Sequence, residues 1–529
     1  IISEPYAKGT KFTSRPDDPY NKVTIESLSG DLQLFDGRMN HNNGWFVLRS
    51  NIKPGVTKGA VKWIITPNVV ADWMYQPVIQ TSQIGYHPAQ DKEAVIEMDI
   101  RDNRKETAQI IRIDADGEKV VKNVTPANWG KFLRYNYLKV DFTDVKEPGL
   151  YKIKYDTSVS PIFRIDNDVY ARGVWQPVLE YFLPVQMCHM RVNEKYRVWH
   201  DCCHMDDAQM APAHNHIDGY DQKEGLSKFK PGEVVPGVNI GGWHDAGDFD
   251  LRIESQAGES YILALAYEAF HPNLDVTSID QINRVTEIHQ PDGKNDLLQQ
   301  VENGALTVVN GYLALGRLYR GIICNDLRQY VLLGDAAAMT DGKIGNEDDR
   351  WIFTEDNPGR ELSTAAQLAA VSRVLKGFND TLSVHCLDIA RKVYASTGNG
   401  NNRALFPKVQ AAVELYLTTG EQPYMDFILD NKELIIKQIG RIGWYTARVE
   451  KQFAQMKNKK AKAFSTAFRK ALTGYEQELN KQVQETPYGI PYRPHIWGAG
   501  WDIQRFGFQH YFLTTAYPEI FPKAPVFNA

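Results

Sequence analysis

The N-terminal third of the chain alternates apolar and polar residues in short runs that are typical of strands. Turn sequences such as Asp116-Gly117 and Pro148-Gly149 separate these runs. Their spacing predicts a β-sandwich over residues 78–167, with strands at 94–100, 109–113, 135–142 and 150–155. Runs at 22–25 and 61–65 are also strand-like. Residues 1–77 therefore form either extra strands or a separate small β-module.

After residue 168 the apolar positions take helical spacing, which predicts an all-helical domain over residues 168–529. The helical runs cover residues 170–187, 254–270, 296–319, 362–377, 384–394, 409–417 and 424–437. Two segments rich in Gly, Pro, Asn and Asp, at 206–237 and 341–358, are predicted as long loops, and long ordered loops often carry function. We interpret the lysine-rich run at 455–469 as a solvated helix face.

Composition limits the kind of partner. The chain has 529 residues, 43% of them hydrophobic, which allows two to four domains at about 150 residues each. A net charge of -5 argues against nucleic acid, because such a partner calls for a basic face. No apolar run is long enough for a transmembrane segment. The start at Ile1, without Met, fits a processed or trimmed chain whose export signal has already gone, so the compartment is not directly readable from it; we expect an exported protein that is secreted, periplasmic or at the cell surface.

One motif carries chemistry, and it sets two carboxylates three residues apart just before a helical run. Its residues are Gly241-Gly242-Trp243-His244-Asp245-Ala246-Gly247-Asp248. The small residues between Asp245 and Asp248 let both side chains point the same way. Neighbouring carboxylates resist joint ionisation, and a site that holds and deprotonates a water can use the resulting pKa difference. By itself the motif is equally consistent with an acidic surface turn at a helix start.

Three motifs together resemble a known family. In order they are Ser82-Gln83-Ile84-Gly85-Tyr86-His87-Pro88, then Cys203-His204-Met205-Asp206-Asp207-Ala208, then the motif from Gly241 to Asp248. With them the chain resembles glycoside hydrolase family 9, the endoglucanase family, in the subgroup that has an N-terminal immunoglobulin-like domain. The resemblance implies an immunoglobulin-like β-sandwich followed by an (α/α)6 barrel. It also implies inverting hydrolysis of β-1,4-linked glucan, as polysaccharide or oligosaccharide, of cellulose, mixed-linkage or xyloglucan type.

The resemblance assigns Asp248 as the catalytic base and Asp245 as a holder of the attacking water. Inversion needs roughly 6.5–9.5 Å between acid and base carboxyls, so Asp245 and Asp248 share the water side. The family's acid, in an Asn-Glu segment, has no counterpart before Ala529. We therefore expect a barrel that is incomplete at its C-terminus. Either the chain is a fragment of a longer enzyme, or it is a non-catalytic glycan-binding relative; a lyase on the same barrel is a third hypothesis.

Five cysteines are too few for a disulfide-stapled fold, yet three of them lie close together in the sequence. By resemblance to family members with His at the position of His244, the set Cys188, Cys203, His204 and His244 is a candidate structural zinc site. The alternatives are a disulfide from Cys188 to Cys203, buried thiols, or Cys202 as the ligand in place of Cys203. Calcium is possible, without assignable ligands.

Three tryptophans fall in or beside loops that the resemblance places at the substrate cleft. They are Trp243, Trp497 and Trp501. Sugar faces stack on aromatic rings, so these three are the predicted substrate-binding residues. Cys324 and Cys386, on predicted helices, are expected to be small core residues.

Overall fold

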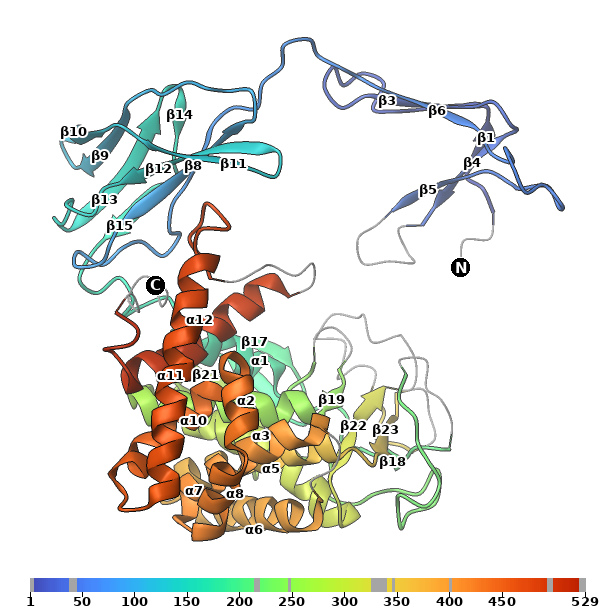
Figure 1. Ribbon diagram of the computed structural model, residues 1–529. Coiled ribbons are helices and arrows are strands. Elements are labelled where there is room, and N and C mark those ends of the chain that lie inside the picture. Colours follow the sequence, from blue (N-terminus) through green and yellow to red (C-terminus); the bar gives the residue numbers. More distant parts are fainter. Residues whose placement is uncertain are drawn as a thin grey trace. The chain divides into compact units, whose positions relative to one another are not determined.

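A computed structural model describes residues 4–37, 45–213, 219–245, 249–324, 340–344, 348–398, 402–491 and 498–522 (Figure 1). The chain forms two compact units. The first consists of Ile1–Val78, Glu97–Arg104 and Leu133–Asn136. The second consists of Ile79–Ile96, Lys105–Phe132 and Tyr137–Ala529.

The N-terminal strands pair with one another in two antiparallel three-stranded sheets, ordered β1-β4-β5 and β2-β3-β6. The strands are β1 (Ala7–Gly9), β2 (Lys11–Ser14), β3 (Val23–Ser27), β4 (Leu32–Asp36), β5 (Phe46–Arg49) and β6 (Trp63–Pro67). The runs predicted at 22–25 and 61–65 correspond to β3 and β6.

The predicted β-sandwich is present as two further sheets, ordered β10-β9-β13-β14 with β15 paired to β13, and β11-β12-β8-β7. Tyr86, Phe142 and Phe163 pack together in its core, with ring centres 5.1–5.5 Å apart. The strands are β7 (Val78–Gln80), β8 (Glu93–Asp99), β9 (Ala108–Asp114), β10 (Gly117–Val124), β11 (Ala127–Phe132), β12 (Tyr135–Asp141), β13 (Gly149–Tyr155), β14 (Ser158–Val159) and β15 (Phe163–Ile165).

The C-terminal part is mainly helical, as predicted. After a π-helical turn, η2 (Val178–Phe182), the helices are α1 (Leu183–Gln186), α2 (Ile253–Phe270), α3 (Asp296–Leu315), α5 (Pro358–Leu375), α6 (Asp380–Ser396), α7 (Asn402–Thr419), α8 (Gln422–Asp430), α9 (Lys432–Lys437), α10 (Ile439–Gln455), α11 (Lys459–Gln482) and α12 (Ala499–Ala516). Asparagine side chains accept hydrogen bonds from the first turns of several of them: Asn295 before α3, Asn357 before α5, Asn379 before α6 and Asn458 before α11.

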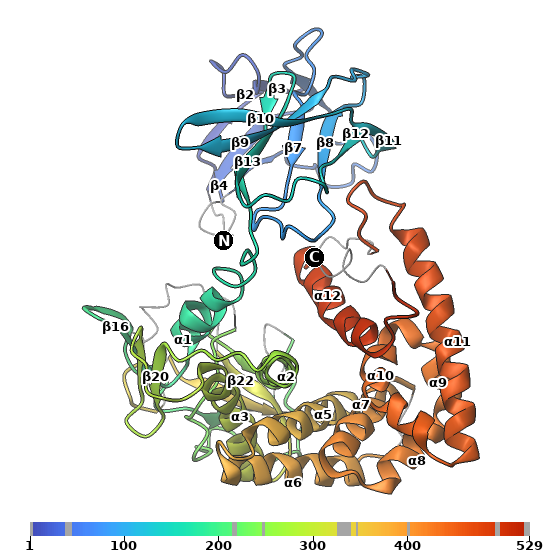
Figure 2. The same ribbon diagram turned by 90° about the vertical axis from the view of Figure 1, so that its left-hand side faces the viewer.

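Helix α5 lies at the centre of this helical part and packs against α2, α6 and α7 (Figure 2). Four of its alanines, at positions 365, 366, 369 and 370, are fully buried. Their small side chains let the neighbouring backbones approach closely, and this burial makes α5 the core of the helical layer. In the part of the chain that the structure describes, no helix is both long and apolar enough to cross a membrane.

The prediction of an all-helical domain needs a correction, because two four-stranded sheets lie among the helices, ordered β17-β16-β21-β20 and β18-β23-β22-β19. Segment 341–358, predicted as a loop, contains β23, and Cys324, predicted on a helix, ends β22. Strands of two to six residues leave too short a period-2 pattern to be recognised. The strands are β16 (Arg191–Glu194), β17 (Arg197–His200), β18 (Gln209–Met210), β19 (Leu251–Arg252), β20 (Thr277–Asp280), β21 (Val285–Ile288), β22 (Tyr319–Cys324) and β23 (Arg350–Thr354).

Candidate active site

The first two glycines of the Gly241–Asp248 motif lie close to α3, and Gly242 is hydrogen-bonded to α3 and to the chain after α1. Gly241 has a φ of +69°, and a Cβ there would lie 2.4 Å from the carbonyl oxygen of Asn303. Gly242 donates its N–H to that carbonyl at 3.0 Å. The Gly242 carbonyl accepts from the Asn303 side chain at 3.1 Å and from the N–H of Cys188 at 2.9 Å. Only glycine fits the close approach at position 241.

The structure corrects the prediction for Trp243, which lies in the core and is 2% exposed. Its indole N–H donates to Gln300 at 2.8 Å, and Gln256 bonds its backbone N–H and carbonyl, both at 2.9 Å. A Cβ on Gly304 would lie 2.4 Å from the ring, so the ring fills the space beside α3. A ring with no exposed face cannot stack on a sugar. The sequence does not distinguish an aromatic residue of a loop motif that faces a cleft from one that faces the core.

Asp245, by contrast, reaches solvent, with 27% of its side chain exposed. Its carboxylate lies 3.1 Å from Nε of Arg252, and its N–H donates to the carbonyl of Asp250 at 2.9 Å, which closes the turn. Burial raises the pKa of Asp245, and the charge of Arg252 opposes that rise. The turn thus presents a held carboxylate that can accept a hydrogen bond from a water molecule.

Of the other three predicted catalytic and substrate-binding residues, Trp501 alone lies within the described residues. Asp248 and Trp497 lie outside the described residues. Trp501, on α12, is 66% exposed, and the guanidinium of Arg505 lies 5.7 Å from the centre of its ring. An exposed ring of this kind can bind the apolar face of a sugar, so the expectation for Trp501 stays a prediction.

The four predicted metal ligands do come together. Cys188, Cys203, His204 and His244 are all buried, and their ligand atoms lie within 4.8 Å of one another. The separations are 3.8 Å between the two sulfurs, 3.7 Å from the Cys188 sulfur to Nδ1 of His204, and 3.4 Å from the Cys203 sulfur to Nε2 of His244. Tetrahedral zinc bonds to sulfur and nitrogen place the ligand atoms about 3.4–3.8 Å apart, so this set fits zinc.

The pKa shifts favour metal binding at His204 and Cys188, whereas the hydrogen bond to Cys188, with burial, raises the pKa of Cys203 well above its ordinary value. Burial lowers the pKa of His204 to about 4, with the charge of Arg350 adding to the effect, so the imidazole is neutral near pH 7. Burial alone would raise the pKa of Cys188, but the hydrogen bond from Cys203 and the charge of Arg350 outweigh it, and the net shift is well below the ordinary value. A neutral imidazole and a thiolate are the forms that bind a metal.

Of the alternatives for these cysteines, the disulfide and Cys202 as the ligand do not fit the structure, whereas buried thiols at Cys188 and Cys203 do. All five are free, and the sulfurs of Cys188 and Cys203 are too far apart for a disulfide bond. The sulfur of Cys202 points instead to the carbonyl of Arg284, at 3.8 Å. Among the described residues a separate group of carboxylates also converges, and oxygen ligands of this kind suit calcium: Asp206, Asp341 and Asp348.

Comparison with protein families assigns two regions of the chain. The model of glycosyl hydrolase family 9 matches residues 178–524, which is more than half of the chain. The chain belongs to glycosyl hydrolase family 9. The model of the cellulase N-terminal immunoglobulin-like domain matches residues 74–160, the region of the β-sandwich. The family, and an immunoglobulin-like domain before it, are therefore confirmed.

Individual relatives of this family 9 chain are distant. A xyloglucan-specific endo-β-1,4-glucanase of Bacteroides ovatus is 24% identical over 455 residues, which cover 80% of this chain and 72% of the relative. Endoglucanase D of Acetivibrio thermocellus is 19% identical over 378 residues, and the match covers 68% of this chain and 54% of that relative. This chain therefore spans about half the length of Endoglucanase D.

A solved structure supports the fold. The crystal structure of a zinc-binding triple mutant of a family 9 endoglucanase matches with a TM-score of 0.62 at 19% identity, over 84% of this chain and 81% of the other. At this identity the match shows a shared fold. A helical family 9 domain is consistent with the (α/α)6 barrel that the sequence predicts.

Sequence reasoning missed charged residues around the motif of this family 9 chain. Glu259, on α2, has an exposed side chain by surface area, but protein atoms crowd its carboxyl, and this crowding together with the charge of Asp245 raises its pKa to about 7. Because Glu259 lies within a helix and outside any motif, only the folded arrangement reveals it. A carboxyl that titrates near neutral pH is a candidate for proton transfer.

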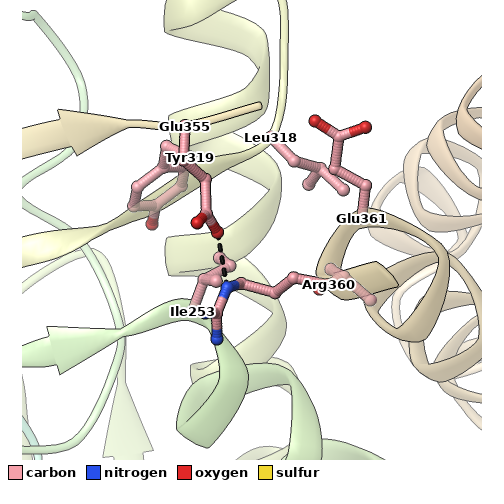
Figure 3. Close-up of a pocket in the computed structure, with 7 residues that line it drawn as sticks. Ile253, Leu318, Tyr319, Glu355, Arg360 and Glu361 are labelled. Carbon is pink, nitrogen blue, oxygen red and sulfur yellow. Dashed lines mark ion pairs between the residues drawn. The ribbon is translucent and has the colours of Figure 1, made fainter. Parts of the chain in front are cut away.

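A chain of ion pairs runs beside α2. Glu254 pairs with Arg320 and, at 3.0 Å, with Arg360, which in turn pairs with Glu355 at 2.5 Å. Figure 3 shows the Arg360–Glu355 pair in a small pocket lined also by Ile253 at the start of α2. These residues come from α2, β22, α5 and, for Glu355, the connection between β23 and α5, so the sequence alone does not bring them together.

Proposed function

We propose that this family 9 chain hydrolyses β-1,4-linked glucan with inversion of configuration, in a polysaccharide or oligosaccharide of cellulose, mixed-linkage or xyloglucan type. The observation that carries the proposal is the glycine turn that presents Asp245 to solvent with a raised pKa. The endoglucanases among its relatives support the substrate class, and the xyloglucan-specific relative supports including branched glucans.

In the proposed reaction, Asp245 accepts a hydrogen bond from the attacking water and holds it below the anomeric carbon. Asp248 takes the proton as the water oxygen bonds to that carbon and the glycosidic bond breaks. The leaving oxygen receives a proton from an acid on the opposite face of the sugar, roughly 6.5–9.5 Å from the base. Asp245 and Asp248 are too close in sequence to occupy both faces, and we assign the acid to no residue.

We further propose that Cys188, Cys203, His204 and His244 hold a structural zinc ion. The fit of their separations to tetrahedral coordination supports this assignment. When bound, the ion supplies cross-linking rather than chemistry on the substrate. His244 immediately precedes Asp245, and its N–H donates to the carbonyl of Gln186 at 2.8 Å, so the ligands hold the catalytic turn against the end of α1. Because glucan polymers lie outside cells, an exported location belongs to the proposal.

The test is hydrolysis of cellulose, mixed-linkage glucan and xyloglucan, with the anomeric form of the first product followed by NMR. Asp248→Asn should lower kcat by about 10²- to 10⁴-fold, the range that general base catalysis supplies. Asp245→Asn should lower it less. Asp426→Asn, which alters an exposed carboxylate on α8, is the matched control and should keep the wild-type rate.

Each outcome distinguishes the hypotheses. Inverted product and loss of rate in Asp248→Asn support the proposal. Binding of glucan by the wild-type chain without any hydrolysis would support the non-catalytic glycan-binding alternative. Release of an unsaturated product would indicate a lyase. Wild-type kcat in Asp248→Asn would show that the base is another residue.

A further inference from the structure

Three buried side chains form one network beside the turn. Arg350 on β23, Asp207 and His189 are each 5% exposed or less. One carboxylate oxygen of Asp207 lies 2.8 Å from Nε2 of His189, and the other accepts from Nε of Arg350 at 3.1 Å. A terminal nitrogen of Arg350 also donates to Asp207. A buried guanidinium with a paired carboxylate costs solvation energy, so its further contacts indicate what it holds in place.

Those further contacts go to the two ends of the catalytic turn. His189 Nδ1 donates to the carbonyl of Gly241, at 3.0 Å, where the motif begins. Arg350 donates to the carbonyl of Phe249, the residue that follows the motif. The network therefore binds the backbone on both sides of Asp245.

The same guanidinium reaches the metal-ligand group. The terminal nitrogen that donates to Asp207 also lies 3.1 Å from the sulfur of Cys188. Arg350 thus contacts Asp207, Phe249 and Cys188 from a single planar group with donors in fixed directions. A lysine ammonium has one nitrogen and cannot make these three contacts together.

We propose that Arg350 is a positioning residue for hydrolysis, which holds Phe249 directly and Gly241 through Asp207 and His189, on the two sides of Asp245. Because the N–H of Asp245 donates to the carbonyl of Asp250, next to Phe249, these contacts determine where the carboxylate of Asp245 lies. The inference rests on the proposed function. A displacement of a catalytic group by about 1 Å can lower the rate about 100-fold, so a network that fixes both ends of the turn affects kcat more than substrate affinity.

The experiment compares Arg350→Lys with Ile352→Ala. Ile352 is also fully buried on β23, so the control lowers stability on the same strand but leaves the network intact. Arg350→Lys should lower kcat about 10- to 100-fold, the range found for residues that support a site from behind, with KM within about twofold. Amide hydrogen exchange over residues 244–252 should rise in Arg350→Lys. Ile352→Ala should keep kcat and the exchange of this segment near wild type.

The outcomes separate this inference from the proposed function. If wild-type protein hydrolyses no glucan, the proposed function fails, and the exchange over residues 244–252 alone decides on the network. Faster exchange there in Arg350→Lys supports positioning; exchange and kcat equal to wild type overturn it, as does an equal loss of kcat in Ile352→Ala. Should Arg350→Lys not fold, Asp207→Asn, which keeps the side-chain shape, replaces it with the same expected results.

Discussion

Replacing Gly241 by alanine tests whether the close approach of the turn to α3 positions Asp245, the carboxylate proposed to hold the attacking water. Gly241 has a φ of +69°, and an added Cβ would lie 2.4 Å from the backbone oxygen of Asn303 and 2.9 Å from Cβ of Leu306. Both neighbours belong to α3, whose backbone cannot give way as the end of a flexible side chain would. We therefore expect the turn itself to move away from the helix.

The expected loss of stability has two parts. A left-handed backbone costs about 1–2 kcal/mol for a residue with a Cβ. Moving the turn breaks the two hydrogen bonds between Gly242 and Asn303, at 3.0 and 3.1 Å, each worth about 0.5–1.5 kcal/mol. The total is about 2–5 kcal/mol by these values. Gly237 has a φ of +78° with nothing within 4 Å of its Cβ position. Gly237→Ala should therefore lose only the cost of a left-handed backbone, about 1–2 kcal/mol.

Urea unfolding of both variants gives the comparison, together with kcat on glucan at a temperature where both are folded. The loss in free energy of unfolding should be about 1–3 kcal/mol larger in Gly241→Ala than in Gly237→Ala, which is the value of the two hydrogen bonds. Only Gly241→Ala should lower kcat. Equal free energies of unfolding for the two variants would refute the steric reasoning. A kcat unchanged in Gly241→Ala would show that the contact with α3 does not position Asp245.

Three further predictions concern the metal, the pH dependence and the substrate. Metal analysis should find one zinc ion per chain in wild type and less in Cys203→Ser. A chelator should lower the free energy of unfolding, because zinc binds the folded state. Freshly purified protein without metal would contradict this prediction. Folding raises the pKa of Glu259 from 4.5 to about 7, so its contribution to stability is greatest below pH 4.5 and is lost as pH rises towards 7. Unfolding measured at pH 5 and pH 8 should therefore show a smaller fall in Glu259→Gln than in wild type, and equal falls would refute the shift. Trp501→Ala should weaken glucan binding about 2- to 10-fold in a binding isotherm, the worth of one aromatic contact, whereas unchanged binding would remove Trp501 from the site.

Much of the site was predictable because its residues lie in short motifs. The four metal ligands fall within three stretches of chain, and the structure brings all of them together. The side chain of Asp245 reaches solvent, as its predicted role requires. The prediction that Trp243 binds substrate is wrong, because its side chain is buried. The direction of that side chain depends on the residues of α3 that pack beside it. Arg350 was not predictable, because it lies 143 positions from Asp207 on a strand too short to recognise.

The sequence by itself determined the family, the β-sandwich followed by helices, and the local turn that holds Asp245. These properties depend on neighbours within a few residues, whose spacing and conformational freedom are written directly in the chain. Only the tertiary structure decided which groups surround that turn: the pairing with Arg252, the raised pKa values of Asp245 and Glu259, and the contacts of Arg350. Such electrostatic and packing effects depend on distances between distant segments, and folding alone sets those distances.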